Sequence, residues 1–327
     1  MRRRDFLALT AGSSLAAGLT RPVLAQDTWP SQPVRLVVPF AAGGPTDIPA
    51  RLFADELSKM LPQRVVVENR TGAGVVVGSD LVAKAPKDGH TLLYSTIAHS
   101  VLRALFPRLP FDPVADFQPV ALMGVIPMLL LVNKDLPARN LPELVKLFRD
   151  NPGKYDYGSS GNGGAVHLAT ELFLKRAGDL KVNHIPYRGS AAAMPDLLSG
   201  RLAMFIDVAA GGLPYAKRGE ARALGVSADK RIPQAPDVPT FAEGGVPNAE
   251  SYTWHMVFAP AGTPAPVVQA INAAFNKVAA MESVQRRLTD LTMIVRSDTT
   301  PETAKKWLMD EIAKWEPIIR DAGIKID

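Results

Sequence analysis

The stretch "VRLVVPFAAGGPTDIPARL", residues 34–52, decides the fold that we expect. An apolar, β-branched run ends at Phe40, the pair Gly43–Gly44 follows, and Thr46 and Asp47 open an amphipathic pattern with the period of a helix. A strand, a glycine turn and a helix start expose backbone N–H groups at the helix N-terminus, which suits a carboxylate or a phosphate. The stretch therefore predicts an α/β protein that holds an anion after its first strand.

The beginning of the chain predicts export. Residues 1–26 read "MRRRDFLALTAGSSLAAGLTRPVLAQ", with a basic start, a short apolar middle and small residues near the end. We expect a signal peptide over residues 1–25, cleaved after Ala25. Its apolar middle is too short for a membrane span, which needs roughly 20 residues. Arg3-Arg4 resembles the twin-arginine export signal, and an ordinary secretory signal with an arginine-rich start is the alternative.

Composition narrows the classes of function. The chain has no cysteine, which excludes disulfides, thiol catalysis, thiolate metal sites and a lipid anchor at the processing site. The net charge is +5, and residues 1–25 carry +3 of it, so the rest of the chain is close to neutral. Lysine and arginine are scattered rather than clustered, so we expect no binding of nucleic acid. These features favour a protein that is free in the periplasm and is not a lipoprotein.

Short apolar runs alternate with longer helical patterns along the rest of the chain. The runs are apolar throughout, which indicates parallel strands in sheets that are covered on both faces. Thr263-Pro264 and Thr300-Pro301 predict helix starts, with threonine as the cap and proline in the first helical position. In open sheets of this kind, ligands bind at the carboxyl ends of the strands. The expected strands are 34–38, 65–67, 92–94, 120–123, 128–132, 155–158, 183–186, 204–207, 223–226 and 257–259.

Three segments share the plan of strand, small residues and helix, at 37–47, 65–78 and 155–168. None has the lysine of a nucleotide phosphate loop, and the strand after the second segment lacks the acidic end of a dinucleotide site. A hydrolase would use Ser160, but Asn162 stands where its elbow needs glycine. The histidines show no paired metal spacing. We therefore expect no enzyme chemistry, no metal and no cofactor.

A family resemblance rests on segments that occur in order along the chain: "PFAAGGPTDIPARLFADEL", "VVENRTGAG", "DGHTLLYST", "YGSSGNGGAVHLATELF", "HIPYRG" and "FAPAGTP". Together they resemble the solute-binding proteins of tripartite tricarboxylate transporters, often called the Bug family. The resemblance implies a type II periplasmic-binding-protein fold, in which two α/β domains joined by two crossovers close on a ligand cleft. It places domain 1 at 27–126 plus 252–327 and domain 2 at 127–251. We expect a monomer.

Members of this family hold small carboxylates with backbone amides, hydroxyls and water, and with few arginines. The residues that we expect to bind the ligand are Phe40, Ala41, Gly43, Gly44, Asp47, Ser95, Ser159, Ser160, Gly161, Asn162, His167, Tyr187 and Asp207.

Several of these residues have a second interpretation. Asp47 either contacts the ligand, through a water, or caps the helix that begins near Ile48. His167, Tyr187 and Asp207 either contact the ligand or serve the packing around it.

Gly164 stands where the family usually has serine, which favours a less polar carboxylate.

The function that the resemblance implies is capture of a small carboxylate for the inner-membrane subunits of a tripartite tricarboxylate transporter. The ligand is a di- or tricarboxylate, an acidic amino acid or an aromatic carboxylate, and it favours the closed state of a hinged cleft. Two alternatives stay open. One is a ligand sensor that signals to a membrane receptor, and the other is a periplasmic hydrolase that uses Ser160 and His167.

Overall fold

The structure is a computed structural model that describes residues 29–326, and all structural statements refer to them. The expected signal peptide and its cleavage site lie outside these residues. None of the helices within 29–326 combines the length and the apolar character needed to cross a bilayer.

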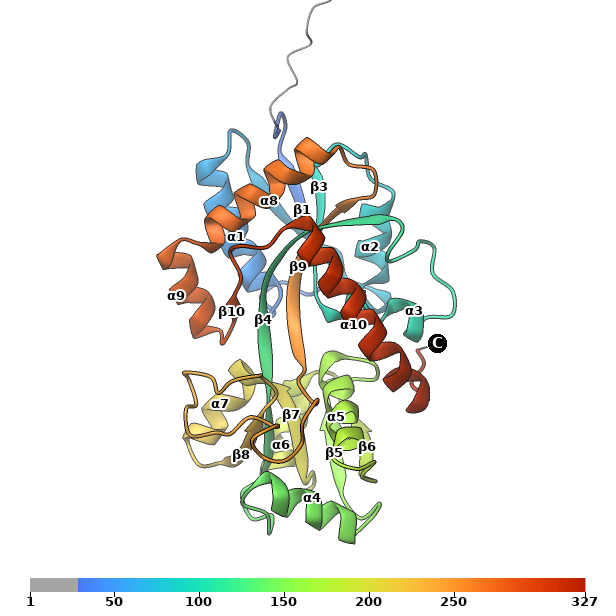
Figure 1. Ribbon diagram of the computed structural model, residues 1–327, viewed down its shortest axis with the longest axis vertical. Coiled ribbons are helices and arrows are strands. Elements are labelled where there is room, and N and C mark those ends of the chain that lie inside the picture. Colours follow the sequence, from blue (N-terminus) through green and yellow to red (C-terminus); the bar gives the residue numbers. More distant parts are fainter. Residues whose placement is uncertain (1–28, 327) are drawn as a thin grey trace, which may run out of the picture.

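The described residues form two lobes, one above the other in Figure 1. The first lobe, at the top, is built from both ends of the chain, whereas the second lobe comes from its middle. The first lobe contains β1 (Val34–Val38), α1 (Asp47–Met60), β2 (Val65–Asn69), α2 (Val76–Ala83), β3 (Thr91–Ser95), α3 (Leu102–Leu105), β9 (Tyr252–Pro260), α8 (Ala265–Ala279), α9 (Glu282–Asp290), β10 (Ile294–Val295) and α10 (Pro301–Asp321). The second lobe contains α4 (Leu141–Asp150), β5 (Asp156–Ser159), α5 (Ala165–Arg176), β6 (Asn183–Pro186), α6 (Ser190–Leu198), β7 (Met204–Val208), α7 (Ala209–Lys217) and β8 (Ala221–Val226).

One strand, β4 (Phe117–Asn133), belongs to both lobes. The sequence predicted two strands here, at 120–123 and 128–132, and the structure joins them into one strand of 17 residues. Up to Pro127 this strand pairs with β9, and from Met128 it pairs with β7. The ladder therefore changes its partner at a single peptide step. The division into domains at 126/127 and 251/252 stays a prediction.

The prediction of parallel strands is right for one part of the sheet and wrong for another. β1 lies parallel to β2 and β3, and β5 lies parallel to β6 and β7. In contrast, β9 lies antiparallel to β3 and β4, and β4 lies antiparallel to β7 and β8. The reason is that β4 leaves the first lobe and β9 returns to it, so the two strands run in opposite senses. Burial on both faces makes such strands as apolar as parallel ones, and composition alone does not separate the two cases.

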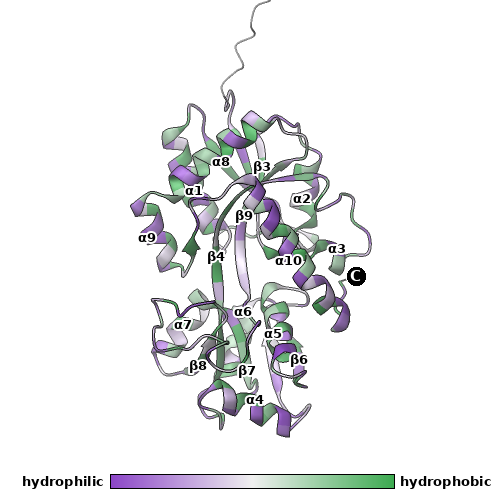
Figure 2. Cartoon of the chain, viewed as in Figure 1, coloured by the Kyte–Doolittle hydropathy of each residue, from purple (hydrophilic) through white to green (hydrophobic). Residues whose placement is uncertain are grey.

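The core of the first lobe extends into the second. Leu168 and Leu172 of α5 pack in one apolar cluster with Trp254 of β9 and Trp315 of α10. Figure 2 shows mostly apolar residues along β4, and polar residues on parts of the helices such as α10 and α4. Helix α5, which comes directly after the glycine loop of the second lobe, is thus fixed against the last helix of the first lobe.

The two predicted helix starts differ in outcome. At α10 the prediction is confirmed, because Thr300 is the cap, Pro301 is the first helical residue and Thr303 completes a capping box. At α8 the prediction is wrong by one residue: Pro264 itself is the cap, and the Thr263 hydroxyl donates backwards to the Pro260 carbonyl. The local Pro260 carbonyl competes with the helix N–H groups for the threonine hydroxyl, and here the carbonyl is its partner.

Glu311 ties α10 to the sheet, which gives a testable prediction. Its Oε2 accepts hydrogen bonds from the indole N–H groups of Trp254 at 3.0 Å and Trp315 at 2.9 Å, and the residue is 6 % exposed. Glu311→Leu should lower the free energy of unfolding by about 2–4 kcal/mol, because both buried donors lose their acceptor. Glu311→Gln, which keeps one oxygen, should cost about 1 kcal/mol. Urea unfolding measures both, with the exposed Glu316→Gln as a control, and an equal cost for the two Glu311 variants would contradict the assignment.

Candidate functional site

The strand directions bring the glycine loops of both lobes to one junction. β3 runs antiparallel to β9, whose first residue Tyr252 pairs with Pro127, so the parallel strands of the first lobe end toward the junction. β7 runs antiparallel to β4, with Val208 opposite Met128, so the parallel strands of the second lobe end toward it from the other side. Because ligands of open α/β sheets bind beyond the carboxyl ends of the strands, the junction between the lobes is the candidate site.

The first loop, Phe40–Thr46, is fixed by hydrogen bonds to the carboxylate of Asp47. The carboxylate of Asp47 accepts hydrogen bonds at 2.8 Å from the Gly43 N–H, from Arg51 Nε and from Asn69 Nδ2. It is 1 % exposed and is the first residue of α1. Burial alone would raise its pKa, but the hydrogen bonds from these three partners outweigh it and lower the pKa.

Asp47 therefore organises the loop rather than the helix cap. The cap of α1 is Thr46. The Asp47 carboxylate accepts its hydrogen bond from the Gly43 N–H, which precedes it in the loop, and not from an N–H of the first helical turn. The amide of Asn69 also donates to the Phe40 carbonyl at 2.9 Å. Arg51 also forms an ion pair with Asp47, with Nε at 2.8 Å from Oδ2.

The amides that the first loop leaves available are not those of the glycines. The Gly43 N–H is taken by Asp47, and the Gly44 N–H donates to the Ala41 carbonyl at 3.3 Å. The amides of Ala41 and Ala42, both exposed, donate to no acceptor within residues 29–326. Ala41 was among the expected residues and Ala42 was missed, although it lies inside the quoted stretch.

The second loop, Ser159–Gly164, is held by histidines. The Gly161 N–H donates to Ser159 Oγ at 3.1 Å, and Ser159 Oγ lies 2.6 Å from His184 Nε2. The Gly163 N–H donates to His167 Nδ1 at 3.0 Å. Ser159 is fully buried, whereas Ser160 and Gly161 are half-buried and Asn162 is exposed. The amides of Ser160 and Asn162 have no acceptor among the described residues.

The pairing that a hydrolase would need is not the one formed. His167 uses Nδ1 for the Gly163 amide and stacks its ring on His184, so it is not the base of Ser160. The serine beside an imidazole is the buried Ser159, and its partner is His184. Sequence reasoning missed His184, and the segment "NHIPYRG" gives no sign of it, since the contact joins residues 25 positions apart.

The remaining expected residues lie at the same edge but are engaged within their own lobes. The Tyr187 hydroxyl donates to Asp196 at 2.5 Å, and burial followed by this bond raises the pKa of Tyr187 to about 12. Asp207 Oδ1 accepts from Ser190 Oγ at 2.6 Å and from the Val208 N–H at 2.8 Å. Burial raises the pKa of Asp207 although both bonds oppose the shift. These contacts join the starts of α6 and α7.

Ser95 ends β3 with a hydroxyl that has no partner among the described residues, and it is fully buried. A buried hydroxyl without a hydrogen bond costs free energy, so a water or a ligand atom beside it would be stabilised. Asn69 is the last residue of β2, which lies beside β1, and it is paired with Val38. The rule that polar residues at strand ends mark a site would have found Asn69 from the sequence.

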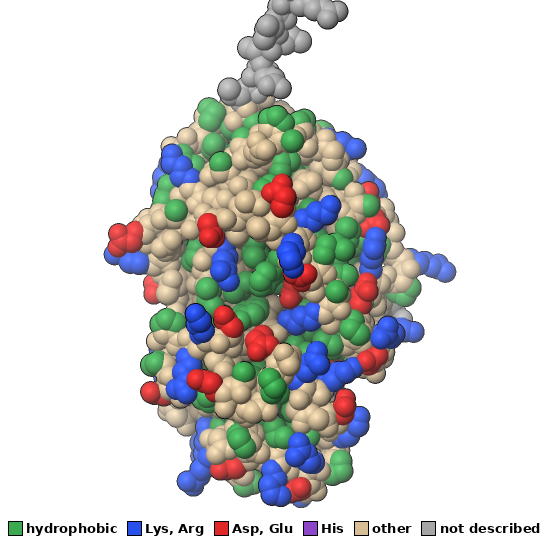
Figure 3. Space-filling model, in the orientation of Figure 1, with side chains coloured by type: hydrophobic (Ala, Val, Ile, Leu, Met, Phe, Trp, Pro, Cys, Tyr) green, Lys and Arg blue, Asp and Glu red, His purple; other side chains and the backbone are tan. Residues whose placement is uncertain are grey.

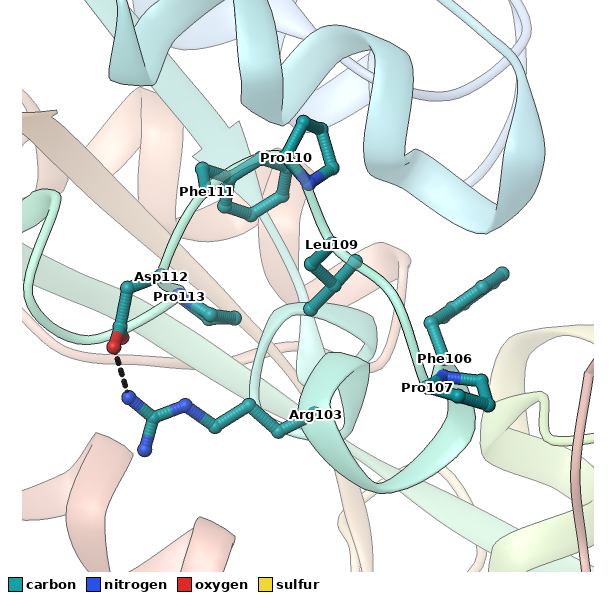
Figure 4. Close-up of a pocket in the computed structure, with 8 residues that line it drawn as sticks. All are labelled: Arg103, Phe106, Pro107, Leu109, Pro110, Phe111, Asp112 and Pro113. Carbon is teal, nitrogen blue, oxygen red and sulfur yellow. Dashed lines mark hydrogen bonds and ion pairs between the residues drawn. The ribbon is translucent and has the colours of Figure 1, made fainter.

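A separate cavity lies outside this junction, in the loop between α3 and β4. It has a volume of about 360 Å³ and is drawn in Figure 4, where Arg103 points to Asp112 and forms an ion pair with it. None of the expected site residues lines it. Its neighbour Leu105, in α3, packs close to Gly163 and so supports the second loop from the first lobe.

Comparison with known proteins identifies the family. A family profile described as "Tripartite tricarboxylate transporter family receptor" matches residues 49–324. The chain belongs to this family. Its members are periplasmic solute-binding proteins, and the resemblance given by the glycine loops is confirmed.

The relatives cover almost the whole chain. BugT of Bordetella pertussis is 36% identical over 314 residues, which span 95% of each protein. A protein from the tcbD–tcbE intergenic region of Pseudomonas sp. (strain P51) is 41% identical over 314 residues, 96% of this chain and 91% of the relative.

Solved structures of receptors share the fold of this chain. MatC of Rhodopseudomonas palustris, solved with bound malate, is 34% identical with a TM-score of 0.76 and covers 89% of this chain and all of its own. Another R. palustris protein, solved with adipate, is 35% identical with a TM-score of 0.77 and covers 91% of this chain and all of its own. The predicted two-lobed α/β periplasmic-binding fold is confirmed by this likeness.

Buried histidines give a prediction for the stability of the receptor. Burial lowers the pKa of His99 to about 4 and that of His255 to about 3, and burial together with the charge of His184 lowers the pKa of His167 to about 3. A histidine in the unfolded chain has a pKa of about 6.5. Below that pH these histidines bind protons in the unfolded chain but stay neutral in the folded chain, which favours unfolding. The free energy of unfolding should stay level above pH 6.5 and fall below it, by up to about 1.4 kcal/mol per pH unit for each histidine.

Urea unfolding at intervals between pH 7.5 and 4.5 checks this expectation. His99→Leu should make the slope shallower by one proton, because leucine cannot bind a proton in the unfolded chain. A free energy of unfolding that does not change between pH 6.5 and 5 would show that these imidazoles are not held neutral.

Proposed function

We propose that this receptor captures a small dicarboxylate between its lobes and presents it to the inner-membrane subunits of its transporter. The observation that supports the proposal is the pair of loops at the junction, each with amides that lack a protein acceptor among the described residues. Ala41 and Ala42 supply them from the first lobe, and Ser160 and Asn162 supply them from the second. A ligand with a carboxylate at each end satisfies both sets at once, and relatives of this chain were solved with malate and with adipate.

Binding without arginine is consistent with the charges around the loops. The carboxylate of Asp47 is matched by Arg51 and Asn69 inside the first lobe. The first turns of α1 and α5 come directly after the two loops, and the positive ends of their dipoles favour an anion. On the face drawn in Figure 3, cationic and anionic side chains are interspersed, so no large field of one sign competes with the site.

The proposal includes the other expected features of a transport receptor. The chain is exported by the signal at residues 1–25, is cleaved after Ala25 and acts as a monomer in the periplasm. Its lobes divide at 126/127 and 251/252, where the chain passes from one lobe to the other in β4 and returns in β9. The two lobes close on the ligand. The proposed role involves no chemistry on the ligand, and the engagement of His184 with Ser159 and of His167 with Gly163 supports it. A sensor would use the same closed surface, and a pull-down with membrane components separates the two roles.

Thermal unfolding with adipate and with malate tests the ligand class. After removal of any bound ligand by unfolding and refolding, each acid at about 100 times its dissociation constant should stabilise the folded state by about 2.7 kcal/mol, or several degrees. The matched control is 1,6-hexanediol, which has the chain length of adipate and no charge. A shift with the diol or with sugars, and none with any mono-, di- or tricarboxylate, would refute the proposal.

Asp47→Asn distinguishes loop support from ligand contact. Asparagine has one oxygen where aspartate has two, so Gly43, Arg51 and Asn69 cannot all keep their acceptor. The dissociation constant for adipate or malate should rise about tenfold, because the loop is no longer fixed. If Asp47 instead faced a ligand carboxylate, removal of its charge would tighten binding. Calorimetric titration decides, with the exposed Asp55→Asn on the same helix as the control.

A further inference from the structure

A stack of three aromatic rings lies beneath the second loop. The ring of His184 stacks on His167, with centroids 3.9 Å apart, and also lies beside Tyr157, with centroids 4.9 Å apart, and both pairs lie within 17° of parallel. The rings of Tyr157 and His167 are 6.4 Å apart and tilted by 34°. Tyr157 is fully buried and His167 is 5 % exposed. Glu171 closes the group: it accepts a hydrogen bond from the Tyr157 hydroxyl and lies 3.8 Å from His167 Nε2. The stack therefore joins residues from β5, α5 and β6.

This stack holds alternate amides of the loop. Gly161 reaches it through Ser159 Oγ, which contacts His184, and Gly163 reaches it directly through His167 Nδ1. Both glycines have positive φ, at 132° and 69°, which turns the backbone between them. The amides that precede each of these glycines, those of Ser160 and Asn162, are the ones without an acceptor among the described residues.

We propose that His167 and His184 are positioning residues, which fix the amides of Gly161 and Gly163 so that those of Ser160 and Asn162 stay available to the ligand carboxylate. The inference rests on the proposed function, because it assigns the ligand to this loop. Neither imidazole needs to touch the ligand. Without the stack the loop would be free to turn its amides toward water, and each binding event would have to order it again.

The chemistry of His167 explains why a neutral imidazole is used. Its Nδ1 accepts the Gly163 N–H and therefore carries no proton, which places the ring proton on Nε2, the atom that faces Glu171. Protonation of Nδ1 would set two N–H groups against each other. Burial and the neighbouring His184 lower the pKa of His167 to about 3, so this conflict does not arise near neutral pH.

The test compares two substitutions at His167. Asparagine places its Oδ1 close to the position of Nδ1 and keeps an acceptor for Gly163, whereas leucine keeps bulk and removes the acceptor. The dissociation constant for adipate or malate should rise about tenfold or more in His167→Leu and stay within about threefold in His167→Asn. In the same proteins, amide hydrogen exchange of Gly163 should become fast in His167→Leu and stay slow in His167→Asn.

His99→Leu is the matched control. It removes another buried imidazole, packed on Phe117 and Phe258 at the end of β4 remote from the junction, and it should destabilise the fold without changing affinity or Gly163 exchange. Unchanged affinity and unchanged exchange in His167→Leu would overturn the inference. The exchange measurement needs no ligand, so it decides the role of His167 even if the wild-type protein binds no organic acid, a result that would refute only the proposed function.

Discussion

The fold depends on the ladder of one strand, β4, which exchanges its partner between Pro127 and Met128. Before this step the strand completes the sheet of the first lobe, and after it the strand begins the sheet of the second. Because β9 returns beside it in the opposite sense, the parallel strands of both lobes end at the same place. No side chain of the site has to create this convergence. It follows from the strand directions that the backbone ladders record.

Given that convergence, each lobe solves the same problem with different chemistry. A glycine loop that binds an anion through its amides must be flexible enough to turn and rigid enough to keep its donors aimed. In the first lobe a buried carboxylate, Asp47, takes one amide of the loop and is itself held by Arg51 and Asn69. In the second lobe a neutral imidazole, His167, takes one amide and is itself held by a ring stack.

The sequence was sufficient to predict local features and those that a shared family pattern implies. The stretch at 34–52 predicts β1, its loop and α1, and the two-lobed fold is what the family resemblance implies. The direction of β4 and β9 could not be predicted, since an antiparallel strand buried on both faces has the same composition as a parallel one. The glycine amides drew attention to Gly43 and Gly44, yet these are consumed by the loop itself. The contacts of His184 were also beyond reach, because His184 pairs with Tyr157 only across the β5–β6 ladder, and a strand register is needed before it can be placed near a loop.

The packing of α5 on α10 constrains how the receptor can move. Leu168 and Leu172 share a buried apolar cluster with Trp254 and Trp315, and Lys175 at the far end of α5 forms an ion pair with Asp321. Prying this flank apart would expose large aromatic surface to water, at a steep free-energy cost. For the proposed closing motion, this flank is therefore the expected pivot. The expected opening side is the opposite one, where a single hydrogen bond from the Gln234 side chain to the Thr289 carbonyl, 2.7 Å long, would have to break.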